Sequence, residues 1–416
     1  MCVAPVGKIT RIQGNRGICD FEGVEKEISL MLLPTAKEGD YVAVHAGYAV
    51  QLVKDYKKLL QEMVVRNVIG EQLLARIEEA NQSLGAKEIK IMNFCGTHEY
   101  SIVKYGLREL LAENIKLVSG PGCPVCVVPT TEIVTALKLL DQEDIILTTY
   151  GDMFRVPTPL GSLKEAKASG KDVRIVYGID EAVKIAQATQ KQVVHFAIGF
   201  ETTAPTTASA LLEAQELDNF SILSSHRFSA PVMEYVLHNN QMDGVICPGH
   251  VAAVVGEEIF QKAAEEFRIP LVISGFEPLD VLETVALVLE QTIANNPHLE
   301  NQYARVVEVK GNQVARETMD KVFAAQDAAW RGFPVLKNSR MILKDEFAKF
   351  DALKRFALEE QAEGEVANKG CLCGKILQGK HPSQCPMFAE VCRPDDPQGP
   401  CMVSQEGPCF IAFQYM

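Results

Sequence analysis

The sequence predicts an α/β protein with a small N-terminal antiparallel β-barrel, two α/β lobes with parallel sheets around a cleft, and a cysteine-rich C-terminal domain. Three observations predict it. Alternating apolar and polar runs fill the first part of the chain, strand and amphipathic helix patterns alternate from residue 89 to about 310, and cysteines crowd the end. The expected domains are residues 1–65, 66–190, 191–365 and 366–416.

The composition excludes several classes of partner and location. The chain has 416 residues, a formal net charge of −13 and no basic tract, which argues against nucleic acid and against an anionic membrane surface as partners. No apolar stretch is long enough to span a bilayer, and the first residues lack an export signal, so we expect a cytoplasmic protein. Because a reducing compartment keeps thiols open, the 12 cysteines indicate metal binding or catalysis.

Residues 1–53 predict the barrel. The turn residues Gly14-Asn15, Glu22-Gly23 and Gly39-Asp40 separate short strand patterns, as in a small antiparallel barrel of the OB type. Removal of Met1 would leave the thiol of Cys2 beside a free amine, and His45 falls in the last strand. Cys2 and His45 are therefore candidates for chemistry, and a histidine satisfied within the barrel is the alternative for His45.

A helical pattern over residues 55–84, broken at Gly70, connects the barrel to nine strand patterns. These strands are expected at Ile89–Met92, Ile115–Val118, Ile145–Leu147, Val173–Val176, Val193–Ile198, Ser221–Leu223, Gly244–Ile246, Leu271–Ile273 and Val306–Val309. Because strands that alternate with helices form parallel sheets, we expect two lobes with a division near Gln190.

Cys95 and His98 follow the first of these strands within the heptapeptide 93–99. The carboxyl edge of a parallel sheet is where open α/β folds bind ligands, so both side chains are expected at a cleft between the lobes. A thiolate with a nearby imidazole suits a soft metal or a nucleophile. The alternative is an inert buried cysteine with a histidine that caps the next helix.

Cys123 and Cys126 form a Cys-x-x-Cys pair at the start of a predicted helix, after the second strand. A helix N-terminus stabilises a thiolate, so the pair could cycle between dithiol and disulfide. Half of a zinc site is the alternative. The redox interpretation is favoured, because no second Cys-x-x-Cys follows at zinc spacing.

The C-terminal cysteines predict a metal cluster. Residues 310–366 are expected to be helical, with Trp330 as a packing anchor, before the cysteine-rich segment. Four thiols in this proline- and glycine-rich segment suit a [4Fe-4S] cluster better than zinc, because the close pairs of zinc sites are absent. The predicted ligands are Cys371, Cys385, Cys392 and Cys409, with Cys373 and Cys401 left over.

Five motifs together resemble the hydrogenase maturation family HypD. They are Cys95-Gly96-Thr97-His98-Glu99, Gly120-Pro121-Gly122-Cys123-Pro124-Val125-Cys126, Gly199-Phe200-Glu201-Thr202-Thr203, Gly275-Phe276-Glu277-Pro278 and Cys401-Met402-Val403-Ser404. The first 65 residues resemble the partner family HypC, through Met1-Cys2-Val3-Ala4-Pro5 and the run from Gly39 to Ala49. The chain therefore looks like a natural fusion of the two.

The resemblance implies a scaffold that assembles the Fe(CN)2CO group of [NiFe]-hydrogenases. Iron would be held between Cys2 and Cys95 with His98 close by, and His45 would hold or hand on the iron. A HypE-like partner would deliver cyanide as a thiocyanate, and Cys123 and Cys126 with the C-terminal cluster would supply electrons. The finished group would pass to the precursor of the hydrogenase large subunit, and other HypC- or HypD-type proteins are further possible partners.

The chain departs from the family pattern in two places that bear on the site. The spacing between the first two cluster ligands is one residue shorter than is usual in the family, which leaves Cys371 the best match and Cys373 a substitute. Tyr100 stands where many relatives carry a second histidine, so His98 would work alone.

Two other functions fit the residues. A general iron-sulfur disulfide oxidoreductase would use Cys123 and Cys126 as the working pair, and would assign no role to Cys95 or Cys2. A metal-stabilised interaction protein would carry zinc in the C-terminal segment.

Overall fold

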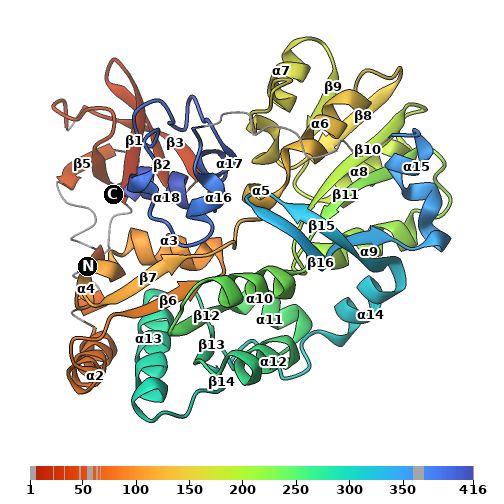
Figure 1. Ribbon diagram of the computed structural model, residues 1–416. Coiled ribbons are helices and arrows are strands. Elements are labelled where there is room, and N and C mark those ends of the chain that lie inside the picture. Colours follow the sequence, from red (N-terminus) through yellow and green to blue (C-terminus); the bar gives the residue numbers. More distant parts are fainter. Residues whose placement is uncertain are drawn as a thin grey trace. The chain divides into compact units, whose positions relative to one another are not determined.

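The structure is a computed structural model that describes residues 6–21, 23–31, 33–45, 48–53, 60–61, 64–65, 67–358 and 370–415. The chain divides into two compact units, Met1–Asn67 and Val68–Met416 (Figure 1). The division falls two residues after the expected boundary at residue 65. Among the described residues, none of the helices combines the length and the apolar character that crossing a bilayer requires.

The first unit is a closed barrel in the order β1-β2-β3-β5-β4. Its strands are β1 (Val6–Gln13), β2 (Arg16–Phe21), β3 (Val24–Ser29), β4 (Tyr41–His45) and β5 (Tyr48–Val53). The pairs β1–β2, β2–β3, β4–β5 and β1–β4 are antiparallel, as predicted, whereas β3 meets β5 in parallel at Ser29 and Tyr48. Alternate residues point inward, so Ile9, Cys19 and Val42 fill the barrel.

The second unit contains two parallel sheets. The five-stranded sheet has the order β14-β13-β12-β6-β7, with β6 (Ile89–Asn93), β7 (Ile115–Ser119), β12 (Gly244–Pro248), β13 (Leu271–Ser274) and β14 (Leu299–Asn301). The four-stranded sheet has the order β11-β10-β8-β9, with β8 (Ile145–Thr149), β9 (Asp172–Ile175), β10 (Gln192–Gly199) and β11 (Phe220–His226). All neighbouring strands within these two sheets run parallel, which confirms the predicted α/β fold with parallel sheets.

The membership of the sheets corrects the predicted division near Gln190. The strand β12 pairs with β6, with Ile246 beside Asn93, so the five-stranded sheet combines strands from both sides of the expected break. The lobes are therefore interleaved along the chain. The predicted strand at Val306–Val309 is also wrong, because the segment forms turns and β14 takes the edge of the sheet.

The helices of the second unit connect and cover the sheets. They are α2 (Val68–Leu84), α3 (Gly96–Lys104), α4 (Leu107–Leu110), α5 (Pro124–Val127), α6 (Thr130–Leu139), α7 (Leu163–Ala168), α8 (Ile179–Gln187), α9 (Ala204–Glu213), α10 (Ser229–Asn239), α11 (Gly249–Val255), α12 (Glu258–Phe267), α13 (Pro278–Ile293), α14 (Gln313–Val322), α15 (Ala352–Arg355), α16 (Cys373–Ile376), α17 (Pro400–Val403) and α18 (Pro408–Tyr415). Short 3₁₀ turns lie at Met153–Arg155, Asp345–Phe350 and Pro382–Gln384. Gly70 lies inside α2 and is buried, so the predicted break there is wrong.

The sequence predicted a helical segment at residues 310–366, but the described part of this segment also contains strands. After α14, β15 (Phe323–Trp330) and β16 (Phe333–Leu343) form an antiparallel hairpin, in which Phe323 pairs with Leu343. The alanines of β15 favour a helix in isolation, but pairing with β16 outweighs this weak preference. Trp330 is buried at the end of β15, and its indole N–H donates to Ser339 Oγ at 3.0 Å, in keeping with a packing anchor.

Candidate functional site

Cys95 lies where the five-stranded sheet meets α3. The strand β6 ends at Asn93, and Cys95 adopts an extended conformation directly before the helix. Glu99 holds this turn in place, because its carboxylate accepts hydrogen bonds from Asn93 at 2.9 Å and from Arg108 at 2.8 Å. The apolar strand and the small residue Gly96 thus place the thiol at the carboxyl edge of the sheet, as predicted.

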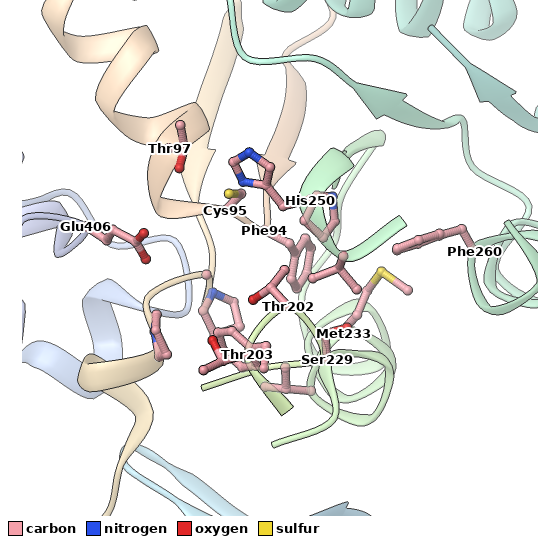
Figure 2. A pocket seen from close by; sticks show the side chains of 17 residues that line it. Phe94, Cys95, Thr97, Thr202, Thr203, Ser229, Met233, His250, Phe260 and Glu406 are labelled. Atoms are coloured by element: carbon pink, nitrogen blue, oxygen red, sulfur yellow. The ribbon is translucent and has the colours of Figure 1, made fainter. Parts of the chain in front are cut away.

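A cavity of about 130 Å³ opens beside the thiol of Cys95. Figure 2 shows Thr97, His250 and Glu406 among the side chains that line it together with Cys95. Burial raises the pKa of Cys95 to about 11, the charge of Glu406 adds to this, and the main-chain N–H groups of Thr97 and His98 offset it in part. The group is therefore a neutral thiol at pH 7, and a bound metal cation would convert it to the thiolate ligand.

His98 is fully buried in the first turn of α3. Its Nε2 lies 2.9 Å from the carbonyl oxygen of Gly275 and 3.3 Å from that of Ser274, so Nε2 carries the hydrogen and donates. Burial lowers the pKa of His98 to about 4, so the ring is neutral. Its Nδ1 is buried without a hydrogen-bond partner among the described residues. A neutral ring with one nitrogen tied to a carbonyl and the other free is the form that binds metals.

An aromatic stack links His98 to the cavity. The ring of Phe276 stacks on His98 with centroids 4.6 Å apart, and on His250 with centroids 3.8 Å apart. His250 is exposed in the second position of α11 and lines the cavity, whereas His98 does not. Burial of part of the ring lowers the pKa of His250. The structure thus adds the imidazole of His250 to the lining of the cavity that Cys95 also lines.

Glu406 reaches the same cavity from the C-terminal segment, between α17 and α18. A Cβ atom added to Gly96 would lie 2.5 Å from the Cβ of Glu406, so glycine is needed for this approach. Loss of solvent around its carboxyl group raises the pKa of Glu406 to about 7, and the negative charge of Asp152 adds to this. Part of the residue is nevertheless exposed. Glu406 also lines a larger cavity of about 850 Å³ with Tyr150 and Asp152.

Cys123 and Cys126 form a disulfide, which is the oxidised form of the predicted redox pair. Both cysteines are buried, and the N–H of Cys126 donates to the sulfur of Cys123 at 3.1 Å in the first turn of α5. A Cβ added to Gly122 would lie 2.4 Å from both the Cα and the nitrogen of Cys95. The loop that carries the disulfide therefore packs directly against the main chain of Cys95.

The six C-terminal cysteines gather in one region of the second unit. The sulfurs of Cys371 and Cys373 are 3.2 Å apart, and the thiol of Cys401 is in hydrogen-bond contact with those of Cys373 and Cys409. Cys392 accepts a hydrogen bond from the N–H of Gln398 at 3.3 Å and interacts electrostatically with Cys371, Cys373 and Cys385. We call these six residues the cysteine cluster.

The donor set of the cysteine cluster suits an iron-sulfur group. Among the described residues, no three His, Cys, Asp or Glu side chains are placed to hold a single metal ion. The sulfurs are packed so closely that a Cβ at Gly399 would lie 2.6 Å from Cys371 Sγ and 2.7 Å from Cys373 Sγ. Clustered thiolates without nitrogen or oxygen donors are the usual ligands of iron-sulfur clusters. The structure brings the predicted ligands together with Cys373 and Cys401.

The two candidates of the barrel lie beyond what the structure describes. Cys2 falls outside the described residues. His45 is the last residue of β4, and its side chain is not described.

The chain matches two known protein families. The HypD family, described as "Hydrogenase formation hypA family", matches residues 68–416, and the HupF/HypC family matches residues 1–61. The chain belongs to the HypD family. Its first 61 residues add a HypC segment, so the predicted fusion is confirmed.

Proteins named as hydrogenase maturation factors match most of this HypD chain. A relative from Methanocaldococcus jannaschii, provisionally named a hydrogenase expression/formation protein, is 46% identical over 84% of this chain and 99% of its own length. Relatives from Azotobacter vinelandii and Escherichia coli, each named hydrogenase maturation factor HypD, are 41% and 40% identical over 83% of this chain and 94% of their own length.

Neither His250, Phe276 nor Glu406 was predicted as a site residue, although Phe276 belongs to the motif Gly275-Phe276-Glu277-Pro278. His250 meets Cys95 through the pairing of β6 with β12, and Phe276 stacks on His250. A glycine directly after a strand was the available signal for His250 and Phe276, since Gly249 and Gly275 follow β12 and β13 directly. No local signal pointed to Glu406.

Proposed function

We propose that this chain matures [NiFe]-hydrogenases as the scaffold on which the Fe(CN)2CO group is assembled. Membership of the HypD family, the fused HypC segment and the names of the relatives support maturation as its function. The iron is the cargo of this reaction. Cys95 and Cys2 would supply thiolates to it, with His98 and His45 as further ligands or as acceptors when the group is handed on.

The observation that carries the proposal is the contact between Gly122 and Cys95. The loop that carries the Cys123–Cys126 pair packs there against the main chain of the cysteine that would hold the iron, which supports a role of the pair beside the iron. A site that must reduce an incoming group beside a bound metal needs this arrangement, because reacting atoms have to be held within a few ångströms. The Nδ1 of His98, in the same turn and without a hydrogen-bond partner among the described residues, would be a further donor for a metal.

The chemistry of cyanide delivery balances with the residues at hand. A thiocyanate on a HypE-like donor and two cysteine thiols would give a donor thiol, cyanide on the iron, one proton and the Cys123–Cys126 disulfide. The S–CN bond breaks, its carbon is taken up as cyanide, and the two electrons come from the dithiol. Glu406 lines the cavity, and its pKa of about 7 would allow it to accept the released proton near pH 7.

The cysteine cluster would hold a [4Fe-4S] group through Cys371, Cys385, Cys392 and Cys409, with Cys373 as the substitute for Cys371. When bound, such a group would relay electrons one at a time from an external one-electron reductant, and two electrons with two protons would return the Cys123–Cys126 disulfide to the dithiol for a second cyanide. The substrates and the thiol chemistry suit a reducing compartment, so we place the protein in the cytoplasm. Its partners would be the cyanide donor and the precursor of the hydrogenase large subunit.

An infrared spectrum tests the proposal. The protein would be isolated without oxygen from cells that express the other maturation factors, and should show bands for two cyanides and one carbonyl. Cys95→Ala should lose these bands and keep the iron-sulfur absorbance. Cys247→Ala is the matched control, because Cys247 is fully buried in β12, beside β6, and lines neither cavity. Full bands in Cys95→Ala would refute the proposal.

The buried disulfide also favours a second candidate, a general iron-sulfur disulfide oxidoreductase. This function would leave the cavity at Cys95 without a role. Steady turnover of small disulfides with an external reductant, undiminished in Cys95→Ala, would support the second candidate over the first.

A further inference from the structure

Arg331 lies in the turn between β15 and β16, and two of its contacts hold the end of α5. Its main-chain N–H donates to the carbonyl of Val127 at 2.9 Å, and its side-chain Nε donates to the carbonyl of Val128 at 2.9 Å. Val127 is the last residue of α5 and Val128 follows it directly. Because α5 is a single turn that includes Cys126, Arg331 fixes the far end of the turn that carries the redox pair.

The other end of the same side chain faces the cysteine cluster. Arg331 lines a cavity of about 270 Å³ together with Cys371, Cys373 and Gly399. Its Nη2 is buried and has no hydrogen-bond partner among the described residues. The charges of Arg331 and of the thiols at Cys373, Cys401 and Cys371 act on one another. The guanidinium of Arg331 therefore donates to the residue that follows α5, and Arg331 also lines the cavity beside the cysteine cluster.

We propose that Arg331 is a positioning residue that couples the Cys123–Cys126 pair to the group held by the cysteine cluster. The inference rests on the proposed function, in which that group is an iron-sulfur cluster.

The physical reason is the cost of a buried charge. An arginine that is only 8% exposed needs a counter-charge, and thiolates of a loaded cluster provide it. The positive charge in turn favours the more negative, reduced form of that cluster, because charges in a buried site are weakly screened. The bond to Val128 sets where the charge lies, so movement of α5 and the potential of the cluster affect one another, and such coupling is reciprocal.

Two equilibria measure the coupling in the full chain with a reconstituted cluster. The first is the one-electron reduction of the cluster in a spectroelectrochemical titration. The second is the exchange of the Cys123–Cys126 disulfide with dithiothreitol, in which one S–S bond breaks, one forms and two electrons and two protons leave the reagent. Peptide mapping after alkylation gives the fraction of each form, and iron and sulfide content shows that the cluster is loaded.

Arg331→Met removes the charge and the bond to Val128. We expect the equilibrium constant for cluster reduction to fall about tenfold, which is 59 mV for one electron. The disulfide should also become harder to reduce, by about fivefold. Arg355→Met is the matched control, because Arg355 also donates to a buried carbonyl, that of Phe220 at 3.0 Å, but lines no cavity of the cysteine cluster. It should change both constants less than twofold.

Arg331→Lys keeps the charge and loses the planar fork, so it should shift the cluster equilibrium about threefold and keep the chain folded. This variant carries the test if Arg331→Met does not load its cluster. An unchanged cluster equilibrium in the loaded variants would overturn the proposal. A cluster shift with no change in the disulfide equilibrium would also overturn it, because the charge would then act on one centre alone.

Discussion

Replacement of Gly122 by alanine would separate the redox pair from Cys95. The added Cβ would lie 2.4 Å from the Cα and the nitrogen of Cys95 and 2.6 Å from the carbonyl carbon of Phe94. All three are main-chain atoms, so no flexible side chain is able to move aside. Ordinary contact begins at 3.4 Å, and the loop therefore has to retreat from Cys95 by about 1 Å.

A retreat of this size has a large effect on rate and a smaller one on stability. Misplacement of reacting groups by about 1 Å costs about 100-fold in rate. Overpacking of a buried site costs about 1–3 kcal/mol in stability, so the chain should still fold. We therefore expect Gly122→Ala to acquire the cyanide bands about 100-fold more slowly than the unchanged protein, in a single-turnover infrared experiment with a cyanide donor.

Gly151→Ala is the matched control for this experiment. Gly151 also follows a strand at the carboxyl edge of a sheet, but its added Cβ would meet only the side chain of Ile175, at 3.7 Å. It should react at the rate of the unchanged protein. Gly122→Ala could instead acquire the cyanide bands as fast as the unchanged protein while its melting temperature falls as expected from overpacking. The contact at Cys95 would then be structural only, and the reasoning would fail.

Three further predictions concern charge. Glu406→Gln removes a negative charge that raises the pKa of Cys95, so alkylation of Cys95 at pH 8 should become several-fold faster. The alkylation rate should change little at pH 6, where Glu406 is mostly neutral. Equal rates in the variant and the unchanged protein at pH 8 would contradict this. Burial raises the pKa of Glu201 from 4.5 to about 7, so its contribution to stability is complete below pH 4.5 and is lost as pH rises through 7. The unchanged protein should therefore lose about 3 kcal/mol of unfolding free energy between pH 5 and pH 8, whereas Glu201→Gln should melt at about the same temperature at both pH values. The same change in melting temperature with pH in both proteins would argue against this. Arg227→Met removes the buried partner that lies 2.5 Å from Glu132, and should lower the unfolding free energy of the second unit by about 3–5 kcal/mol in chemical denaturation. A loss below about 1 kcal/mol would show that Arg340 alone is enough to balance the charge of Glu132.

Local patterns predicted the positions of the candidate cysteines Cys95 and Cys123, because both follow strand ends. The apolar run before Cys95 and the small residues around Cys123 mark turns at the carboxyl edge of the sheet, and both appear there. The crowding of cysteines after residue 370 was also visible in the sequence. These features depend on neighbours in the chain, which is why a sequence displays them.

The features that were missed depend on residues far apart in the chain. The strand β12 joins β6 across about 150 residues, and nothing in either segment specifies the other. The hairpin of β15 and β16 was mistaken for helix, since alanines favour a helix until cross-strand pairing is counted. The meeting of His250 with Cys95 follows from the long-range pairing of β6 with β12. Glu406 reaches the cavity from the C-terminal segment, so no local pattern specifies that the three residues meet.

The interleaved order of the five-stranded sheet has a consequence for synthesis of the chain. The barrel is complete once residue 67 has emerged, whereas β6 cannot pair with β12 until residue 248 is made, and Glu406 is added later still. At about 5–20 residues per second, roughly 15–60 s separate Cys95 from Glu406 on the ribosome. The nascent chain thus carries a finished barrel long before the cavity around its reactive cysteine is able to close.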